Sequence, residues 1–218
     1  FPVAASVAPG PSCERQELLQ MLSHLRAGDI LTLDRGYPSH EVLQALDAAG
    51  IDFVIRVPKS GSFEAAKVVA ESSGNDYIMH IPPPRNGARD GDRGIQVRCV
   101  RVDVGVEDPW LLFTSLRRSD ATVAQLRDLY HMRWTIEESY KLLKCDALSL
   151  RQMHAKSVLG VEQEVLAQLA LISISRLLAA NAAAEHGLQT VDASPKAAVL
   201  AIAKGIVRLM LCDDPDRR

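Results

Sequence analysis

Alternating hydrophobic and polar positions near the start of the chain predict helices and strands in turn. Apolar residues recur on one side of a helix over 14–26, and the short apolar run 29–34 predicts a strand. A second helix is expected between Ser39, which can cap its start, and Gly50, which can close its end. The next strand is expected over 52–58. A strand, a helix and a strand joined by short links form a βαβ unit, in which the two strands are parallel.

The pattern changes after this βαβ unit. Three short runs rich in β-branched and aromatic residues, at 77–81, 95–104 and 110–114, predict the strands of a small antiparallel insertion. A helix is then expected to begin at about Ala121 and to continue without a break to Lys144. The insertion thus separates the βαβ unit from the long helix.

Two further apolar helices, over 158–184 and 195–211, complete the pattern of an α/β protein. We expect four segments along the chain: the first part of an α/β core, a β-rich insertion, the second part of the core with the long helix, and a C-terminal helical segment. Their expected boundaries are 1–58, 59–117, 118–186 and 187–218.

The long helix carries the most informative spacing in the chain. Neighbouring residues are rotated by about 100° around a helix axis, so four polar side chains of this helix point within an arc of roughly 60°, here called the polar stripe. This stripe consists of Tyr130, Arg133, Glu137 and Lys144. A second, apolar stripe is centred about 85° away and is expected to face the core; it consists of Leu129, Met132, Ile136, Tyr140 and Leu143. Glu138 lies on the arc expected to face water, so Glu137 and Glu138 are expected to have different environments.

Composition narrows the class of protein. Of the 218 residues, 47% are hydrophobic and 24% are charged, as in an ordinary folded domain, and a net charge of −2 is not that of a general nucleic-acid binder. Four scattered cysteines without a C-x-x-C pair favour reduced thiols in a cytoplasmic protein. The best apolar run, 165–184, is interrupted by polar residues, so no membrane span is expected. A local basic segment contains Arg117, Arg118, Arg127, Arg133, Lys141, Lys144, Arg151 and Lys156.

Two carboxylates are candidates for metal binding. Asp34 follows a predicted strand and Glu137 lies on the long helix, and carboxylate oxygens are ligands that Mg²⁺ and Mn²⁺ prefer. Taken singly, Asp34 can instead hydrogen-bond its own turn, and Glu137 can form an exposed ion pair with Arg133 or Lys141 worth about 0.3–0.5 kcal/mol. The alignment of Glu137 with tyrosine, arginine and lysine favours a phosphate-processing site, in which two carboxylate-bound metal ions act beside donors to phosphate oxygens.

The spacing Y-x2-R-x3-E-x6-K at Tyr130, Arg133, Glu137 and Lys144 resembles the YREK signature of bacterial insertion-sequence DDE transposases of the group numbered four. The tetrapeptide from Asp34 to Tyr37 resembles that family's second catalytic Asp motif, and a β-rich insertion precedes the glutamate as in the family. The resemblance covers roughly 27–184.

This resemblance implies an RNase H-like core that binds two Mg²⁺ or Mn²⁺ ions, cuts DNA at transposon ends and joins the freed 3′ hydroxyl to target DNA. It implies that Asp34 and Glu137 are catalytic metal ligands and that Tyr130, Arg133 and Lys144 hold the DNA backbone; Lys141 of the basic segment is a further candidate DNA contact. A homodimer in the active complex and a bacterial cytoplasmic, nucleoid-associated protein are also expected.

The chain departs from the family pattern at its front. No Asp precedes Asp29, and the acidic residues there, Glu14 and Glu17, lie on a predicted helix, so the first catalytic Asp is expected upstream. We therefore expect a C-terminal portion of a transposase that is inactive alone. Two alternatives remain, a non-catalytic DNA-binding remnant of a transposase and a stand-alone RNase H-like nuclease. Trp110 is expected to pack within its strand rather than to contact DNA.

Overall fold

The protein is described by a computed structural model covering residues 4–8, 12–59, 63–83, 93–105, 109–144, 154–188 and 195–210. The chain divides into two compact units. One unit is Ala8–Trp134, and the other consists of Phe1–Val7 with Thr135–Arg218.

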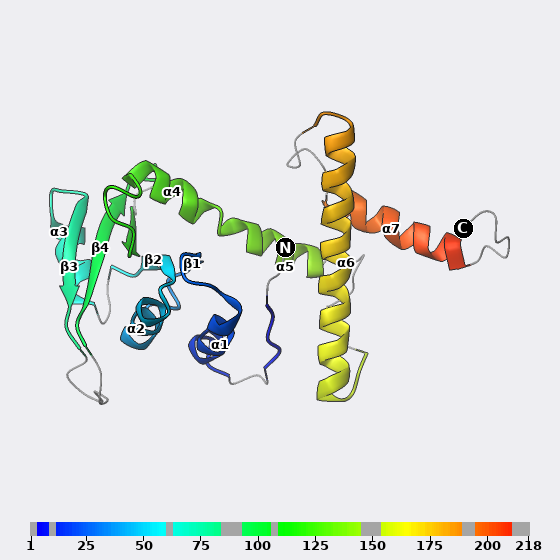
Figure 1. The fold of residues 1–218 in the computed structure, drawn as a ribbon, viewed down its shortest axis with the longest axis horizontal. Coiled ribbons are helices and arrows are strands. Elements are labelled where there is room, and N and C mark those ends of the chain that lie inside the picture. Colours follow the sequence, from blue (N-terminus) through cyan, green and yellow to red (C-terminus); the bar gives the residue numbers. More distant parts are fainter. Residues whose placement is uncertain are drawn as a thin grey trace. The chain divides into compact units, whose positions relative to one another are not determined.

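A five-stranded mixed sheet forms the centre of the unit Ala8–Trp134 (Figure 1). Its strands are β1 (Ile30–Leu33), β2 (Asp52–Val57), β3 (Asp76–Ile81), β4 (Ile95–Val102) and β5 (Trp110–Thr114), and they lie in the order β1-β2-β5-β4-β3. The β1 and β2 strands are parallel, as predicted for a βαβ unit, and the remaining neighbours are antiparallel. The three strands of the segment 59–117, predicted as an insertion, are therefore hydrogen-bonded into the same sheet as the βαβ unit.

Three α-helices cover one face of this sheet and one covers the other. On the first face lie α1 (Glu14–Met21), which continues into the 3₁₀ turn η1 (Leu22–His24), α2 (His40–Ala49) and α3 (Glu64–Glu71). On the second face lies α4 (Val123–His131). The α3 helix was not predicted from the sequence, although its buried residues Ala66 and Val69 are spaced as on one face of a helix.

The ends of α2 were predicted correctly from two residues. The hydroxyl of Ser39 accepts a hydrogen bond from the backbone N–H of Val42 at 3.2 Å, which satisfies one of the donors left over at the helix start. Gly50 ends the helix in the left-handed region, with φ of 65°, where a side chain would be strained. These caps fix where the chain leaves β1 and where it enters β2.

Successive side chains of a strand point to opposite faces of the sheet, so β2 and β5 contribute apolar residues to the clusters on both faces. In β2, Phe53, Ile55 and Val57 point into the cluster beneath α1, α2 and α3, whereas Val54 points into the cluster beneath α4. In β5, Leu111 and Phe113 join the first cluster and Leu112 joins the second. A sheet buried on both faces explains why β2 and β5 read as nearly continuous apolar runs.

The long helix expected over 121–144 is broken in the structure. The α4 helix ends at His131, and α5 (Trp134–Lys144) begins after a turn. The N–H of Arg133 donates to the carbonyl of Tyr130 at 3.1 Å, so this bond spans three residues instead of four and tightens the turn. The prediction of one uninterrupted helix is therefore wrong.

The apolar stripe predicted for the same helix is also largely exposed to solvent. Three of its residues are exposed, namely Met132, Ile136 and Tyr140. Tyr130, assigned to the polar stripe, is instead only 4% exposed, because its ring packs into the cluster between α4 and the sheet. The prediction that Met132, Ile136 and Tyr140 face the core is wrong.

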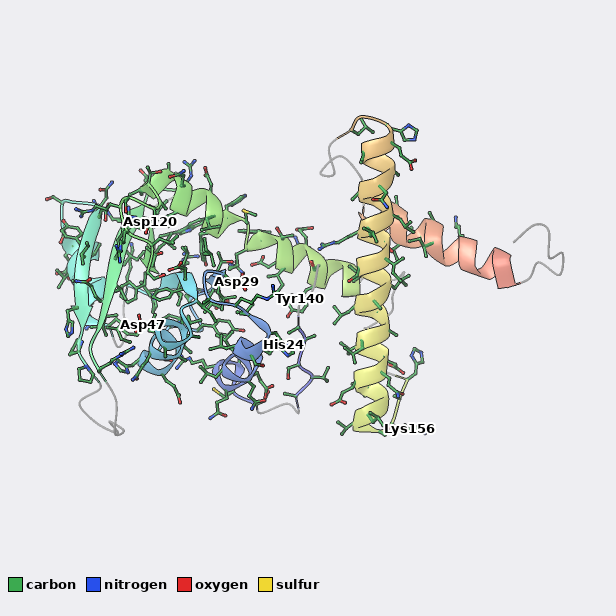
Figure 2. The ribbon with its side chains drawn as sticks, in the orientation of Figure 1. His24, Asp29, Asp47, Asp120, Tyr140 and Lys156 are labelled. Atoms are coloured by element: carbon green, nitrogen blue, oxygen red, sulfur yellow. The ribbon has the colours of Figure 1, made fainter. Side chains whose placement is uncertain are left out.

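A buried arginine on β4 anchors the loop that leads into α4. The guanidinium of Arg98 donates two hydrogen bonds to the carboxylate of Asp76, each at 3.0 Å. It also donates to the carbonyls of Leu116, Arg117 and Ala121 at 3.4, 3.0 and 2.6 Å. Asp120, labelled in Figure 2, holds the same loop by accepting from the N–H of Arg117 at 2.9 Å. The start of α4 is therefore tied to β3 and β4.

The second unit is helical. It contains most of α5, together with α6 (Val158–Glu185) and α7 (Pro195–Met210), whose bounds are close to those predicted. Ser157 caps α6 by accepting from the N–H of Gly160 at 3.1 Å. The guanidinium of Arg176 donates to the hydroxyl of Ser139 at 2.9 Å, which links α6 to α5. By length and composition alone, α6 is apolar enough to cross a membrane, a test that core helices of soluble proteins also pass.

Candidate active site

Asp34 follows the last residue of β1 and begins a tight turn. Its Oδ1 accepts a hydrogen bond from the N–H of Gly36 at 2.8 Å, and its carbonyl accepts from the N–H of Tyr37 at 3.3 Å. A Cβ at position 36 would lie 3.1 Å from that Oδ1, so glycine allows the close approach. The Nε–H of Arg15 on α1 donates to the carbonyl of Gly36 at 3.0 Å and braces the turn. The Oδ1 of Asp34 thus accepts a hydrogen bond within its own turn, as in the alternative interpretation of this residue.

Tyr130 packs α4 against the sheet at the end of the strands where Asp34 lies. Its ring packs edge-on against Trp110 at the start of β5, with the ring centroids 5.1 Å apart. The guanidinium carbon of Arg133 lies 5.7 Å from the centroid of the Tyr130 ring, and the two side chains share a hydrogen bond. Trp110 is half-buried in the cluster beneath α4, so the prediction that it packs within its strand is confirmed.

Arg56 joins this group, although the sequence pattern did not single it out. Leu33 of β1 pairs with Ile55 of β2, and extending that parallel register by one residue brings Asp34 beside Arg56. The guanidinium carbon of Arg56 lies 5.6 Å from the centroid of the Trp110 ring. A charged residue inside the otherwise apolar run of β2 was the signal that could have identified it.

The charged side chains around Tyr130 shift the pKa of its phenol. Burial raises the pKa of Tyr130 and the nearby carboxylate of Asp34 raises it further, whereas the positive charges of Arg133 and Arg56 oppose the rise without cancelling it. The Tyr130 hydroxyl therefore stays protonated at neutral pH and can donate a hydrogen bond. Asp34, Arg56 and Arg133 all act electrostatically on Tyr130, and these four residues are a candidate site that combines a hard oxygen ligand with donors to an anion.

The remaining predicted site residues lie on α5. Glu137 is half-buried and Glu138 is exposed, as predicted from their positions on the helix. Lys141 contacts Glu138 at 2.6 Å, and the hydrogen bond and charge of Glu138 raise the pKa of the Lys141 ammonium. The side chain of Lys144 lies outside the part of the chain that the structure describes.

The structure thus brings together part of the predicted site. Asp34, Tyr130 and Arg133 gather in the unit Ala8–Trp134, whereas Glu137 and Lys141 belong to the other unit. Within the described ranges, no group of three His, Cys, Asp or Glu side chains is placed to hold a metal ion. The carboxylate oxygens of Asp34 and Glu137 are nevertheless the hard donors that Mg²⁺ or Mn²⁺ requires.

Comparison with known proteins assigns the chain to a family. The model of the transposase DDE domain family matches residues 1–174. A comparison with curated proteins gave no match. The family match includes the turn at Asp34, the whole sheet, α4 and α5. On this match over most of its length, the chain belongs to the transposase DDE domain family.

Proposed function

We propose that this protein is an insertion-sequence transposase of the group numbered four, with an RNase H-like catalytic core. The reaction is Mg²⁺-dependent cleavage of phosphodiester bonds at transposon ends, followed by joining of the 3′ hydroxyl to target DNA. The observation that carries the proposal is that Arg133 contacts Tyr130 and that the charge of Asp34 acts on the same tyrosine, so one carboxylate and two phosphate donors from the expected motifs lie near one another at the C-terminal end of β1.

In this reaction Asp34 and Glu137 would hold the divalent cations, Mg²⁺ or Mn²⁺. Such ions activate the attacking oxygen and stabilise the leaving oxygen of the phosphodiester. The guanidinium groups of Arg133 and Arg56 would hold phosphate oxygens beside the bond that is cut. Lys141 and Lys144 would extend these backbone contacts along α5.

Tyr130 has a separate role in the proposal. Its phenol is protonated at neutral pH, and burial raises its pKa further, so it can donate a hydrogen bond to a phosphate oxygen. Its ring is held by Trp110 on one side, which fixes the direction of the hydroxyl before DNA binds. Tyr130 is therefore a positioning group for the DNA backbone.

The reaction is tested with the complete product of the reading frame that encodes this chain. We expect Mg²⁺-dependent joining of a 3′ end to a second DNA molecule, measured with labelled oligonucleotides that carry the terminal sequence of the element. Hydrolysis of DNA without joining would favour the alternative of a stand-alone nuclease. A lack of both reactions would contradict a catalytic role.

A second candidate function is that the chain binds DNA without cutting it. It is favoured by the carboxylates present, since Asp34 and Glu137 are two of the three that the reaction of this family uses. Two carboxylates should hold two metal ions poorly. We expect the chain alone to retain DNA in a gel-shift assay but to leave it intact in Mg²⁺, and cleavage by the chain alone would reject this version.

A homodimer in the active complex and association with the bacterial nucleoid belong to the proposal of a transposase.

Substitutions at Tyr130 should separate its ring from its hydroxyl. Tyr130→Phe keeps the ring against Trp110, so the free energy of unfolding should change by only about 1 kcal/mol, while DNA affinity should fall about tenfold through the lost hydrogen bond to phosphate. Tyr130→Ala also removes the ring and should cost about 3–5 kcal/mol of stability. Chemical denaturation and fluorescence anisotropy measure the two effects.

Tyr140 provides the matched control for Tyr130. Its ring is exposed on α5 and lies off the polar stripe, so Tyr140→Phe should leave both stability and DNA affinity unchanged. If Tyr130→Phe binds DNA as well as the unsubstituted protein does, its hydroxyl does not contact phosphate.

A further inference from the structure

A cavity of about 550 Å³ opens between the end of β4 and the start of α4. Its polar lining includes the side chains of Arg101 on β4, Arg127 on α4 and Asn75, which precedes β3. All of these residues belong to the unit Ala8–Trp134. None of them is part of the site around Asp34, so the cavity is a separate feature that the proposed chemistry does not use.

The two guanidinium groups are held in different ways. That of Arg101 donates from Nη1 to the carbonyl of Ser72 at 2.8 Å and from Nη2 to the carbonyl of Ser73 at 3.5 Å. A guanidinium has more N–H donors than these two bonds use. Arg127 is exposed and pairs with its neighbour Asp128 at 2.9 Å, and such a surface ion pair is weak. Arg101 is therefore fixed at the cavity, and Arg127 can turn toward a ligand at little cost.

The start of α4 adds positive potential to the same cavity. Val123 and Ala124 line it and are the first two residues of the helix, whose backbone N–H groups have no acceptor within the helix. One lining residue, Asp103, is acidic, and its Oδ1 accepts a hydrogen bond from the N–H of Gly105 at 2.9 Å. Arg101, Arg127 and the helix start face this carboxylate, and a bound anion would replace Asp128 as the partner of Arg127, so the cavity offers several donors to an anion.

The cavity and the Asp34 site lie at the same end of the strands, where β1, β2 and β4 finish and β5 begins. Val102 at the end of β4 pairs with Trp110, and β5 continues from there beside the end of β2. Arg127 is one helical turn before Tyr130 on α4, so the two side chains are neighbours on the helix. Figure 1 shows α4 running from the β4 side of the sheet toward the β1 side. A DNA strand that follows α4 would therefore meet both sites.

We propose that this cavity binds a backbone phosphate of the DNA whose neighbouring segment occupies the Asp34 site. The inference rests on the proposed function and adds a second point of attachment to it. Arg127 and Arg101 supply the charge, and the N–H groups at the start of α4 supply further donors. The ligand is a phosphodiester, from either the transposon end or the target DNA, and its recognition is independent of base sequence.

The test removes the charge of Arg127, whose side chain does not support the fold. Arg127→Gln should weaken binding of duplex DNA several-fold, and the slope of log affinity against log salt concentration should fall by about one, because one phosphate contact is lost. Arg127→Lys should restore the slope, since it restores the charge. Fluorescence anisotropy over a range of salt concentrations measures both quantities for the full chain.

Arg93 offers a matched control on the same unit. Its side chain is 61% exposed and pairs with Asp47 of α2, labelled in Figure 2, at 2.7 Å. Arg93 precedes β4, at the opposite end of that strand from the cavity. Arg93→Gln removes the same charge from a similar surface ion pair and should leave the salt slope unchanged.

The possible results separate this inference from the proposed function. An unchanged salt slope in Arg127→Gln, with binding still weakened by Arg133→Gln at the Asp34 site, would overturn the cavity proposal alone. A full chain that does not bind DNA would overturn the proposed function and this inference together. A loss seen only with the terminal sequence of the element assigns the phosphate to the transposon end, and an equal loss with unrelated duplex assigns it to DNA in general.

Discussion

Replacing Glu137 by glutamine, or Asp34 by asparagine, is expected to lower Mg²⁺-dependent strand transfer about a thousand-fold in the complete product of the reading frame that encodes this chain. Each substitution removes a charged oxygen ligand of the proposed metal ions, which are worth several kcal/mol of transition-state stabilisation. Asparagine at position 34 keeps an oxygen that can accept from the N–H of Gly36, so the turn after β1 should persist. Labelled transposon-end and target oligonucleotides measure the reaction.

Glu138 is the control for the loss at Glu137. It is the next residue on α5, it is exposed, and its carboxylate pairs with Lys141. Glu138→Gln should therefore keep strand transfer within about twofold, because a surface ion pair contributes little. DNA affinity measured with a metal chelator should be similar in all three variants. Full strand transfer in Asp34→Asn or Glu137→Gln would show that these carboxylates are not the metal ligands.

Replacing Arg98 by methionine should lower the free energy of unfolding of the chain by about 3 kcal/mol. The side chain is 4% exposed and donates to Asp76 and to three backbone carbonyls of the loop before α4. Methionine fills much of the same volume but leaves the Asp76 carboxylate partly buried without its main partner, and breaking a buried pair in this way is costly. Denaturant titration followed by circular dichroism measures the change.

Arg118 is the matched control, because it binds the same carboxylate from the surface. Its Nε lies 3.1 Å from Oδ2 of Asp76, and its side chain is 59% exposed. Arg118→Met should therefore cost less than about 1 kcal/mol. Equal losses in Arg98→Met and Arg118→Met would mean that burial does not set the strength of the Asp76 contacts.

The pH dependence of stability should follow from the same carboxylate. Burial by itself raises the pKa of Asp76, but the hydrogen bonds and charges of Arg98 and Arg118 outweigh it and hold the pKa below the ordinary aspartate value of 3.8. A carboxylate with a lowered pKa stabilises the folded state above its unfolded pKa, and that contribution disappears as the pH falls through the folded value. The stability difference between the unsubstituted chain and Asp76→Asn should therefore shrink below about pH 4.

Most elements of the fold could be predicted from the sequence because their causes are local. Hydrophobic repeats placed β1, β2, α6 and α7, and the caps at Ser39 and Gly50 set the ends of α2. The parallel pairing of β1 with β2 followed from the βαβ pattern. The sequence could not show that β5 pairs with β2, because hydrogen bonding between distant strands leaves no periodic signal in either strand.

The residues of the candidate site could likewise be predicted only in part from the sequence. By itself, the sequence determined which residues are chemically suited to metal and phosphate, since Asp34, Tyr130, Arg133 and Glu137 were recognised by type and spacing. It misjudged the helix that carries three of them, because the burial of Tyr130 depends on packing against residues distant in sequence, such as Trp110. Only the tertiary structure placed Arg56 beside Asp34, since strand register sets that neighbour. Local propensity and spacing are properties of the chain, whereas burial, register and shared electrostatics arise only when distant segments meet.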